Sequence, residues 1–105
     1  SGLQYKGFTV FHSGNAPIIG IGQTWQDLTS SRSTGVTYTN TTIKPIMVSA
    51  TTNQDGVERY AYVDGIKIVN YNDTAGDIGS LQFIVPPGST YQVTGADMRL
   101  WAELR

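Results

Sequence analysis

Short runs in which apolar and polar residues alternate recur along the chain, and Gly, Asn, Asp and Pro separate them. Successive side chains of a strand point to opposite faces, so such alternation indicates strands with one buried face. The three- and four-residue apolar spacing of an amphipathic helix is absent. The pattern therefore predicts an all-β fold. The expected strands are Phe8–His12, Gln23–Leu28, Val36–Asn40, Lys44–Thr51, Val57–Val63, Ile66–Asn70, Ile78–Val85, Thr90–Thr94 and Met98–Leu104.

The strongest local signal is Asp64-Gly65, which lies between two runs rich in β-branched and aromatic residues. A two-residue type I′ turn needs positive φ at both central positions, and Asp-Gly is a preferred pair there. We therefore expect a hairpin. In its first strand Tyr60 and Tyr62 share one face, and the odd-numbered residues share the other. Both faces thus carry large apolar or amphipathic groups.

About eight short strands at even spacing are typical of a small antiparallel β-sandwich, and we expect one that is jelly-roll-like. Residues 18–105 are expected to form this single domain, because a chain of this length has enough residues for one modest core. Residues 1–17 contain the turn-prone run Ser13–Pro17. We expect them to be a connector from the upstream part of a longer protein, with at most one short strand.

Composition limits the classes of partner. Only 14% of the 105 residues are charged and the formal net charge is −1, whereas binding to nucleic acid requires a basic surface. We therefore expect no nucleic-acid partner. Apolar runs are far shorter than the roughly 18 residues of a membrane span, so we expect no membrane insertion. The chain has no cysteine, so packing, hydrogen bonding or oligomerisation must stabilise the fold.

Few residues are suited to catalysis. His12 is the single histidine and no Gly-x-Ser-x-Gly motif accompanies it, so we expect a structural or exposed role. The oxygen-rich stretch Asn70–Asp77 lacks the ligand spacing of a calcium loop. Several aspartates neighbour Gly, Asn or Thr in expected turns, where they would accept hydrogen bonds from backbone amides. They are Asp55, Asp64, Asp73, Asp77 and Asp97. We therefore expect no enzyme activity, no metal and no cofactor.

Aromatic residues supply a second kind of candidate site. Tyrosine and tryptophan can stack on the C–H faces of sugars while their polar atoms stay in water. The candidates for such a platform are Trp25, Tyr60, Tyr62, Tyr71 and Trp101. For Trp25 and Trp101 we favour the alternative that they fill the core or a subunit interface, because large aromatic side chains are usually buried. Tyr71, in a polar stretch, fits either role.

Four short motifs, GQTWQD, TSSR, TYTNTT and PIMVS, follow one another in a fixed order. Together they resemble a segment near the C-terminus of many bacteriophage and prophage tail-fibre proteins. The motifs span Gly22–Asp27, Thr29–Arg32, Thr37–Thr42 and Pro45–Ser49.

The resemblance extends to the sequences FIVPPGSTYQV, Phe83–Val93, and LWAELR, Leu100–Arg105. Upstream, TVFHSGNAP is similar to the junction between fibre and tip in such proteins. The middle of the chain, Asn53–Ser80, does not share the resemblance, and Ile43 stands where the family pattern has a small residue.

The resemblance implies a homotrimeric fibre whose distal domain contacts the bacterial surface, and hence a location at the distal end of a virion tail fibre. The expected receptor is a surface polysaccharide or an outer-membrane protein. Because loops commonly carry recognition, we expect the receptor contacts in the divergent middle. The candidate contacts are Asn53, Gln54, Asp55, Arg59, Tyr71, Asn72, Asp73 and Asp77. The alternative is a structural C-terminal trimerisation module of a tailspike or fibre whose enzyme or receptor site lies elsewhere.

Overall fold

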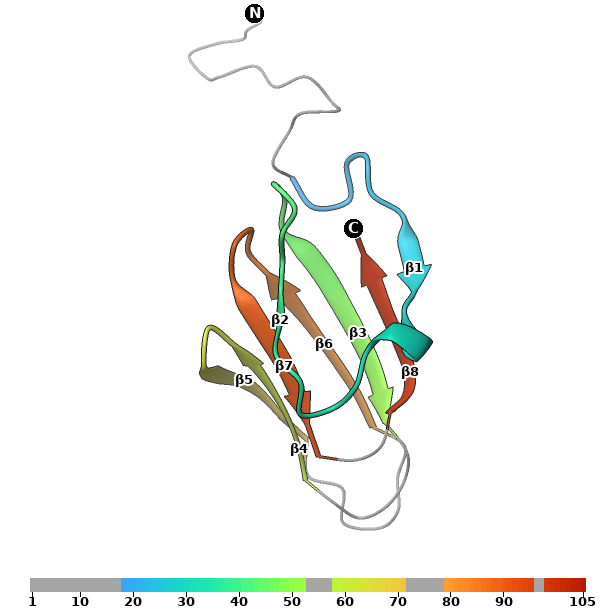
Figure 1. The fold of residues 1–105 in the computed structure, drawn as a ribbon, viewed down its shortest axis with the longest axis vertical. Coiled ribbons are helices and arrows are strands. Elements are labelled where there is room, and N and C mark those ends of the chain that lie inside the picture. Colours follow the sequence, from blue (N-terminus) through green and yellow to red (C-terminus); the bar gives the residue numbers. More distant parts are fainter. Residues whose placement is uncertain (1–17, 53–57, 72–78, 96–97) are drawn as a thin grey trace, which may run out of the picture.

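The computed structural model describes residues 18–52, 58–71, 79–95 and 98–105. Within these ranges the chain forms two antiparallel four-stranded sheets (Figure 1). The first sheet has the order β1-β8-β3-β6 and the second has the order β2-β7-β4-β5. The elements are β1 (Trp25–Asp27), the 3-10 helix η1 (Thr29–Ser31), β2 (Tyr38–Thr39), β3 (Ile46–Thr52), β4 (Arg59–Val63), β5 (Ile66–Tyr71), β6 (Gly79–Val85), β7 (Thr90–Thr94) and β8 (Met98–Leu104).

The predicted all-β class is confirmed, and a strand overlaps each expected run after residue 17, although β3 and β5 each end one residue later than expected. The first two strands are shorter than expected: β1 has three residues and β2 has two. Both are edge strands with a partner on one side only, so fewer ladder hydrogen bonds extend them. The expected strand Phe8–His12 and the connector, residues 1–17, lie outside the described residues.

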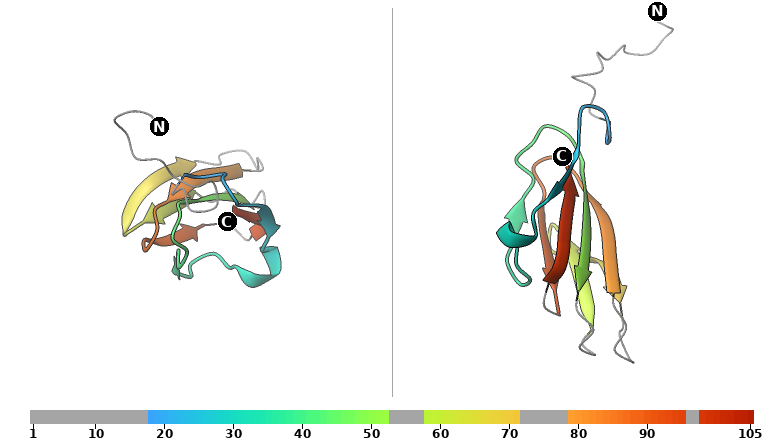
Figure 2. Two further views of the ribbon diagram at one scale, coloured as in Figure 1. Left: turned by 90° about the horizontal axis from the view of Figure 1, so that it is seen from above. Right: turned by 90° about the vertical axis from the view of Figure 1, so that its right-hand side faces the viewer.

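The core lies between the two sheets, which face each other as layers in Figure 2. Alternate residues of β3 and β6 are buried, as their sequence pattern predicts. The buried face of the second sheet comes from β4 and β7. Burying a Val, Leu, Ile or Phe side chain stabilises the fold by about 1.5–3 kcal/mol relative to leaving it exposed. The apolar core consists of Ile46, Val48, Ala50, Ala61, Val63, Leu81, Phe83, Val85, Tyr91, Val93 and Trp101.

The expected hairpin is present between β4 and β5. Asp64 has φ 53° and Gly65 has φ 79°, which are the positive values that a type I′ turn requires. The Asp64 carboxylate accepts hydrogen bonds from the Thr90 amide at 3.0 Å and from the Ser89 hydroxyl at 2.7 Å. At this position the predicted role of a turn aspartate is confirmed, and it also attaches the hairpin to β7.

The strands run between two ends of the sheets. At one, the Arg105 end, the backbones of Thr24 and Arg105 exchange hydrogen bonds of 3.2 and 3.1 Å, and β3 begins nearby. At the other, the Tyr71 end, β3, β5 and β7 finish and β4, β6 and β8 begin (Figure 1). Three strand ends and three strand starts therefore lie together at the Tyr71 end.

Candidate functional site

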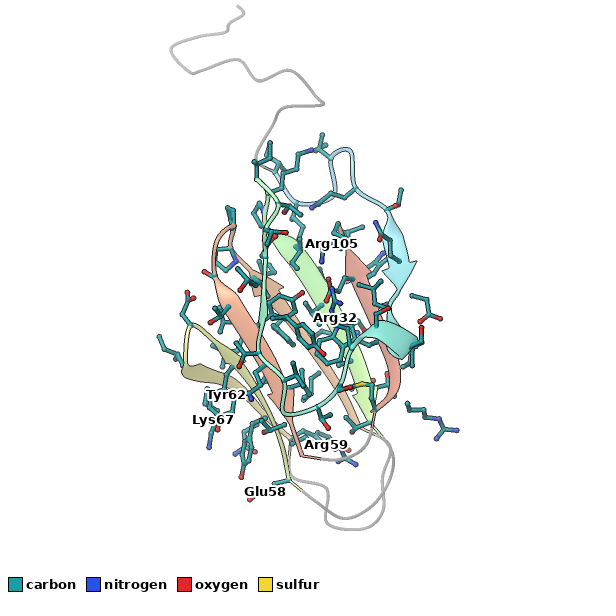
Figure 3. All side chains as sticks on the ribbon, in the orientation of Figure 1. Arg32, Glu58, Arg59, Tyr62, Lys67 and Arg105 are labelled. Carbon is teal, nitrogen blue, oxygen red and sulfur yellow. The ribbon has the colours of Figure 1, made fainter. Side chains whose placement is uncertain are left out.

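Two of the eight candidate receptor contacts, Arg59 and Tyr71, lie within the described residues. The structure brings them together as directly opposed residues of β4 and β5 at the Tyr71 end. Figure 3 shows Arg59 at this end of the molecule, far from Arg105. The remaining candidates fall outside the described residues, and they are Asn53, Gln54, Asp55, Asn72, Asp73 and Asp77.

Arg59 is 0% exposed, and its guanidinium carbon lies 5.3 Å from the centroid of the Tyr71 ring. This separation permits a cation–π attraction. Tyr71 is partly buried and packs against the core. A Cβ atom on Gly79 would lie 2.6 Å from the Tyr71 ring, so the absence of a side chain at Gly79 is what lets the ring fit. In a single chain Arg59 therefore positions Tyr71 and does not itself present a surface.

The outer face of the second sheet carries Tyr60 and Tyr62 side by side. Their ring centroids are 6.3 Å apart and the ring planes are tilted by 60°. The Tyr60 hydroxyl donates to the Glu58 carboxylate at 3.0 Å, and this hydrogen bond raises the pKa of Tyr60. The Lys67 ammonium lies 3.9 Å from the Tyr60 ring centroid. Tyr60 and Tyr62 are both half-buried. Figure 3 shows Tyr62 and Lys67 close together beside β5.

A pocket of about 160 Å³ lies beside Tyr62 on the same sheet. Its lining comes from β4, β7, the hairpin turn and the residue before β2. The residues that form this Tyr62 pocket are Thr37, Tyr62, Gly65, Thr90, Tyr91 and Gln92.

Glu103 on β8 is a buried carboxylate that accepts hydrogen bonds from side chains of both sheets. Glu103 is 0% exposed, and one of its oxygens accepts hydrogen bonds from the Trp101 indole and the Tyr91 hydroxyl, both at 2.9 Å. Arg32 donates from Nε at 3.0 Å and Arg105 donates from Nη1 at 2.6 Å. Four side chains, one of them 71 residues away in the sequence, therefore meet on one carboxylate, and we call this group the Glu103 network.

The charges of the Glu103 network compensate one another. Burial by itself raises the pKa of Glu103, but the hydrogen bonds from Arg32, Arg105, Trp101 and Tyr91 outweigh it and hold that pKa below its ordinary value. Burial and the neighbouring carboxylate raise the pKa of Tyr91. Glu103 is thus ionised and Tyr91 neutral at neutral pH, as a buried ion pair with satisfied hydrogen bonds requires.

Tyr38 on β2 closes the Glu103 network from the second sheet. The Arg32 guanidinium carbon lies 4.7 Å from the Tyr38 ring centroid, and the Tyr38 and Trp101 rings meet edge to face at 5.8 Å. The Tyr38 hydroxyl accepts a hydrogen bond from the Ser33 amide at 2.8 Å. Through these contacts the segment between η1 and β2 packs against Tyr38 of the second sheet, and Tyr38 in turn packs against Trp101 of the first sheet.

The two tryptophans have different positions. Trp101 is fully buried, which confirms that it fills the core, whereas Trp25 is 55% exposed and does not fill the core of a single chain. The burial of Glu103 was not expected from the sequence. The signal was present, because Trp101 and Glu103 are two residues apart and so share one face of β8.

The outer face of the first sheet carries a row of large apolar side chains. The strand register places Trp25 opposite Leu104, Leu104 opposite Met47, and Met47 opposite Ile84. These four residues, which we call the apolar row, therefore run across all four strands. Trp25 and Ile84 are 55% and 49% exposed. Met47 and Leu104 between them are half-buried. A contiguous apolar surface of this kind is typical of an interaction surface.

The described part of the chain was compared with the requirements of a metal site and of a membrane-spanning helix. Within it, no group of three or more histidine, cysteine or acidic side chains is placed to hold a metal ion. The same residues contain no helix that is long and apolar enough to cross a membrane. Comparison of the chain with protein-family models, curated proteins and solved structures found no match.

Proposed function

We propose that this chain is the tip domain of a bacteriophage tail fibre and that it binds a receptor on the bacterial surface without breaking bonds. The observation that carries this proposal is that the Glu103 network draws only on the motifs, whereas the divergent stretch supplies the hairpin at the edge of the second sheet. The Glu103 network is built from motifs that resemble tail-fibre proteins, namely TSSR, TYTNTT, FIVPPGSTYQV and LWAELR. The divergent stretch supplies β4 and β5, and Arg59 and Tyr71 lie opposite each other at the Tyr71 end.

This division of the sequence favours a framework that folds in one way and a variable surface that selects the receptor. Loops that a rigid scaffold positions are the usual carriers of recognition. The divergent stretch contributes Tyr60 and Tyr62 on the outer face and Tyr71 at the end of β5. Aromatic side chains of this kind suit both a polysaccharide and an outer-membrane protein as the receptor.

The apolar row supports the proposed homotrimeric assembly. Its exposed Trp25 and Ile84 would be buried if three copies packed their first sheets around a common axis. A trimer would also present three copies of each receptor site, and linked sites gain avidity without new contacts. We further propose that the two sheets form a jelly-roll-like sandwich within this assembly.

The receptor proposal is tested by binding of the fluorescently labelled chain to a panel of Gram-negative strains. Tyr71→Ala and Asp73→Ala should each reduce binding to a strain that the wild type binds, whereas the exposed β8 substitution Arg99→Ala should not. Thermal unfolding of every variant shows whether a loss of binding reflects a loss of fold. Unchanged binding by both substituted chains would count against the divergent stretch as the receptor site.

The apolar row also favours a second candidate function, a structural trimerisation module whose receptor or enzyme site lies elsewhere in a longer protein. Light scattering of the wild type and of the double substitution Trp25→Ser and Ile84→Ser measures this role, because only the variant should be monomeric. A trimer that binds none of the strains would favour the module over the receptor domain. Release of sugar from surface polysaccharide by the chain alone would contradict both.

A further inference from the structure

The Tyr62 pocket has a lining without charged side chains. Its lining residues include one phenol, Tyr62, two hydroxyl side chains, Thr37 and Thr90, and one amide side chain, Gln92. The charged residues beside it have other contacts: Asp64 accepts hydrogen bonds from Ser89 and Thr90. The Lys67 ammonium, opposite Tyr62 in the strand register, lies over the Tyr60 ring. Ions are therefore poorly matched to this pocket, because they would lose their hydration without gaining an opposite charge.

Hydrogen-bonding capacity remains in the lining. The Gln92 amide nitrogen donates to the Gly35 carbonyl at 2.9 Å, which fixes the orientation of the side chain. Within residues 18–52, 58–71, 79–95 and 98–105, neither the Tyr62 hydroxyl nor the Gln92 amide oxygen has a hydrogen-bond partner. A purely apolar occupant would leave these groups unsatisfied, at a cost of about 1–3 kcal/mol for each group that it buries.

The size of the pocket restricts the occupant further. Its 160 Å³ is smaller than the roughly 300–1,000 Å³ of pockets that enclose drug-sized ligands. It matches a single six-membered ring with polar substituents. A pyranose has this form, since it offers a C–H face for the Tyr62 ring and hydroxyls that both donate and accept hydrogen bonds.

We propose that the Tyr62 pocket binds one neutral pyranose unit of a glycan. The Tyr62 ring lies against the C–H face of the sugar, and Gln92, Thr37 and Thr90 hydrogen-bond its hydroxyls. This inference deepens the proposed function, and it rests on that function only for the bacterial origin of the glycan. Tyr62 belongs to the divergent stretch, whereas Thr37, Thr90 and Gln92 belong to the motifs. The motifs therefore supply a general sugar subsite and the divergent hairpin adjusts its specificity.

The test is titration of the isotope-labelled full chain with methyl glycosides of glucose, galactose, mannose and N-acetylglucosamine, followed by amide NMR. At least one glycoside should shift the signals of Tyr62, Gly65, Thr90 and Gln92. Tyr62→Ala and Gln92→Ala should each weaken that binding about tenfold, as expected for the loss of one well-made contact. Tyr62→Phe, which keeps the ring, should lose less than Tyr62→Ala.

The matched control is Gln82→Ala, because Gln82 is an exposed glutamine on the outer face of the other sheet. It should leave glycoside binding unchanged. The proposal is overturned if no glycoside shifts these signals, or if Tyr62→Ala and Gln92→Ala bind as well as Gln82→Ala. Binding of the same variants to cells separates the two proposals. If the chain binds cells but none of the glycosides, the proposed receptor function stands and a protein becomes the favoured receptor.

Discussion

The Glu103 network and the outer face of the second sheet use similar residue types in opposite ways. In the network, the hydroxyl of the buried Tyr91 donates a hydrogen bond to the Glu103 carboxylate. The Trp101 indole and two arginines also donate hydrogen bonds to this carboxylate. On the outer face, Tyr62 is half-buried and its hydroxyl has no partner among the described residues. Polar groups that are fully satisfied inside stabilise a single packing, whereas partly satisfied groups at the surface remain free to bind a ligand.

The difference depends on strand periodicity and not on composition. Tyr91 and Gln92 are neighbours on β7 and both line the Tyr62 pocket, yet Tyr91 is buried in the core whereas Gln92 is half-buried on the other face. Tyr62 lies opposite Gln92 in the strand register, while Val63 lies opposite Tyr91. Because successive side chains of a strand alternate between faces, a slip of one residue would exchange these roles. The register of β4 against β7 therefore holds the framework and the binding face apart.

The largest expected effect comes from breaking the Glu103 network. Glu103→Gln removes the charge that compensates Arg32 and Arg105, and it should lower the free energy of unfolding by about 3–5 kcal/mol, as for other buried pairs that lose one partner. Urea denaturation measures this loss. The control Glu58→Gln changes an exposed glutamate and should cost less than about 0.5 kcal/mol. Equal losses for both variants would contradict the structural role of the network.

A smaller effect is expected at the Tyr71 end from Gly95→Ala. Gly95 has φ 116°, and a Cβ atom there would lie 2.5 Å from the Glu58 carbonyl oxygen and 3.0 Å from the Arg59 Cα atom. Gly88 also has positive φ, 83°, but open space around its Cα. Gly88→Ala should cost roughly 1–2 kcal/mol for the backbone conformation alone.

Gly95→Ala should cost about 1–3 kcal/mol more than Gly88→Ala, because the added methyl group overpacks β4. Thermal and urea unfolding of the two variants give this difference. If the two losses were the same, the contact between Gly95 and β4 would have no energetic weight, and the Tyr71 end would be less tightly built than the Glu103 network.

Much of the fold could be predicted from the sequence because strand and turn signals are local. The alternation in Ile46–Thr52 and Gly79–Val85 indicates the buried faces of β3 and β6, and Asp64-Gly65 specifies its own turn through positive φ. The order of the strands in each sheet could not be predicted, because it depends on contacts between residues far apart in the chain.

The sites were harder to predict for the same reason. Arg32 and Glu103 are 71 residues apart in the sequence, and a lone glutamate in an alternating strand gives no sign that arginines will cover it. A regular hairpin at Asp64-Gly65 would place Arg59 opposite Asn70, and the irregularity between Ala61 and Tyr62 shifts its partner to Tyr71. The burial of Arg59 depends further on β6 and β7. The Tyr62 pocket joins three separate segments, so periodicity could place Tyr62 on an outward face without indicating what lies beside it.

The smallest expected effect is the part of the acid dependence of stability that the Glu103 network should produce. The folded state holds the pKa of Glu103 below its ordinary value, which for an unfolded chain is about 4.3. The corresponding stabilisation is therefore fully present above about pH 5 and is lost as pH falls through the folded pKa. Urea midpoints between neutral pH and pH 3 should decline in the wild type and decline less in Glu103→Gln. Glu58→Gln should follow the wild type, since removing an exposed carboxylate leaves the buried one to titrate. If Glu103→Gln kept the full decline, the acid sensitivity would arise outside the Glu103 network, and its carboxylate would be no more stabilising than one at the surface.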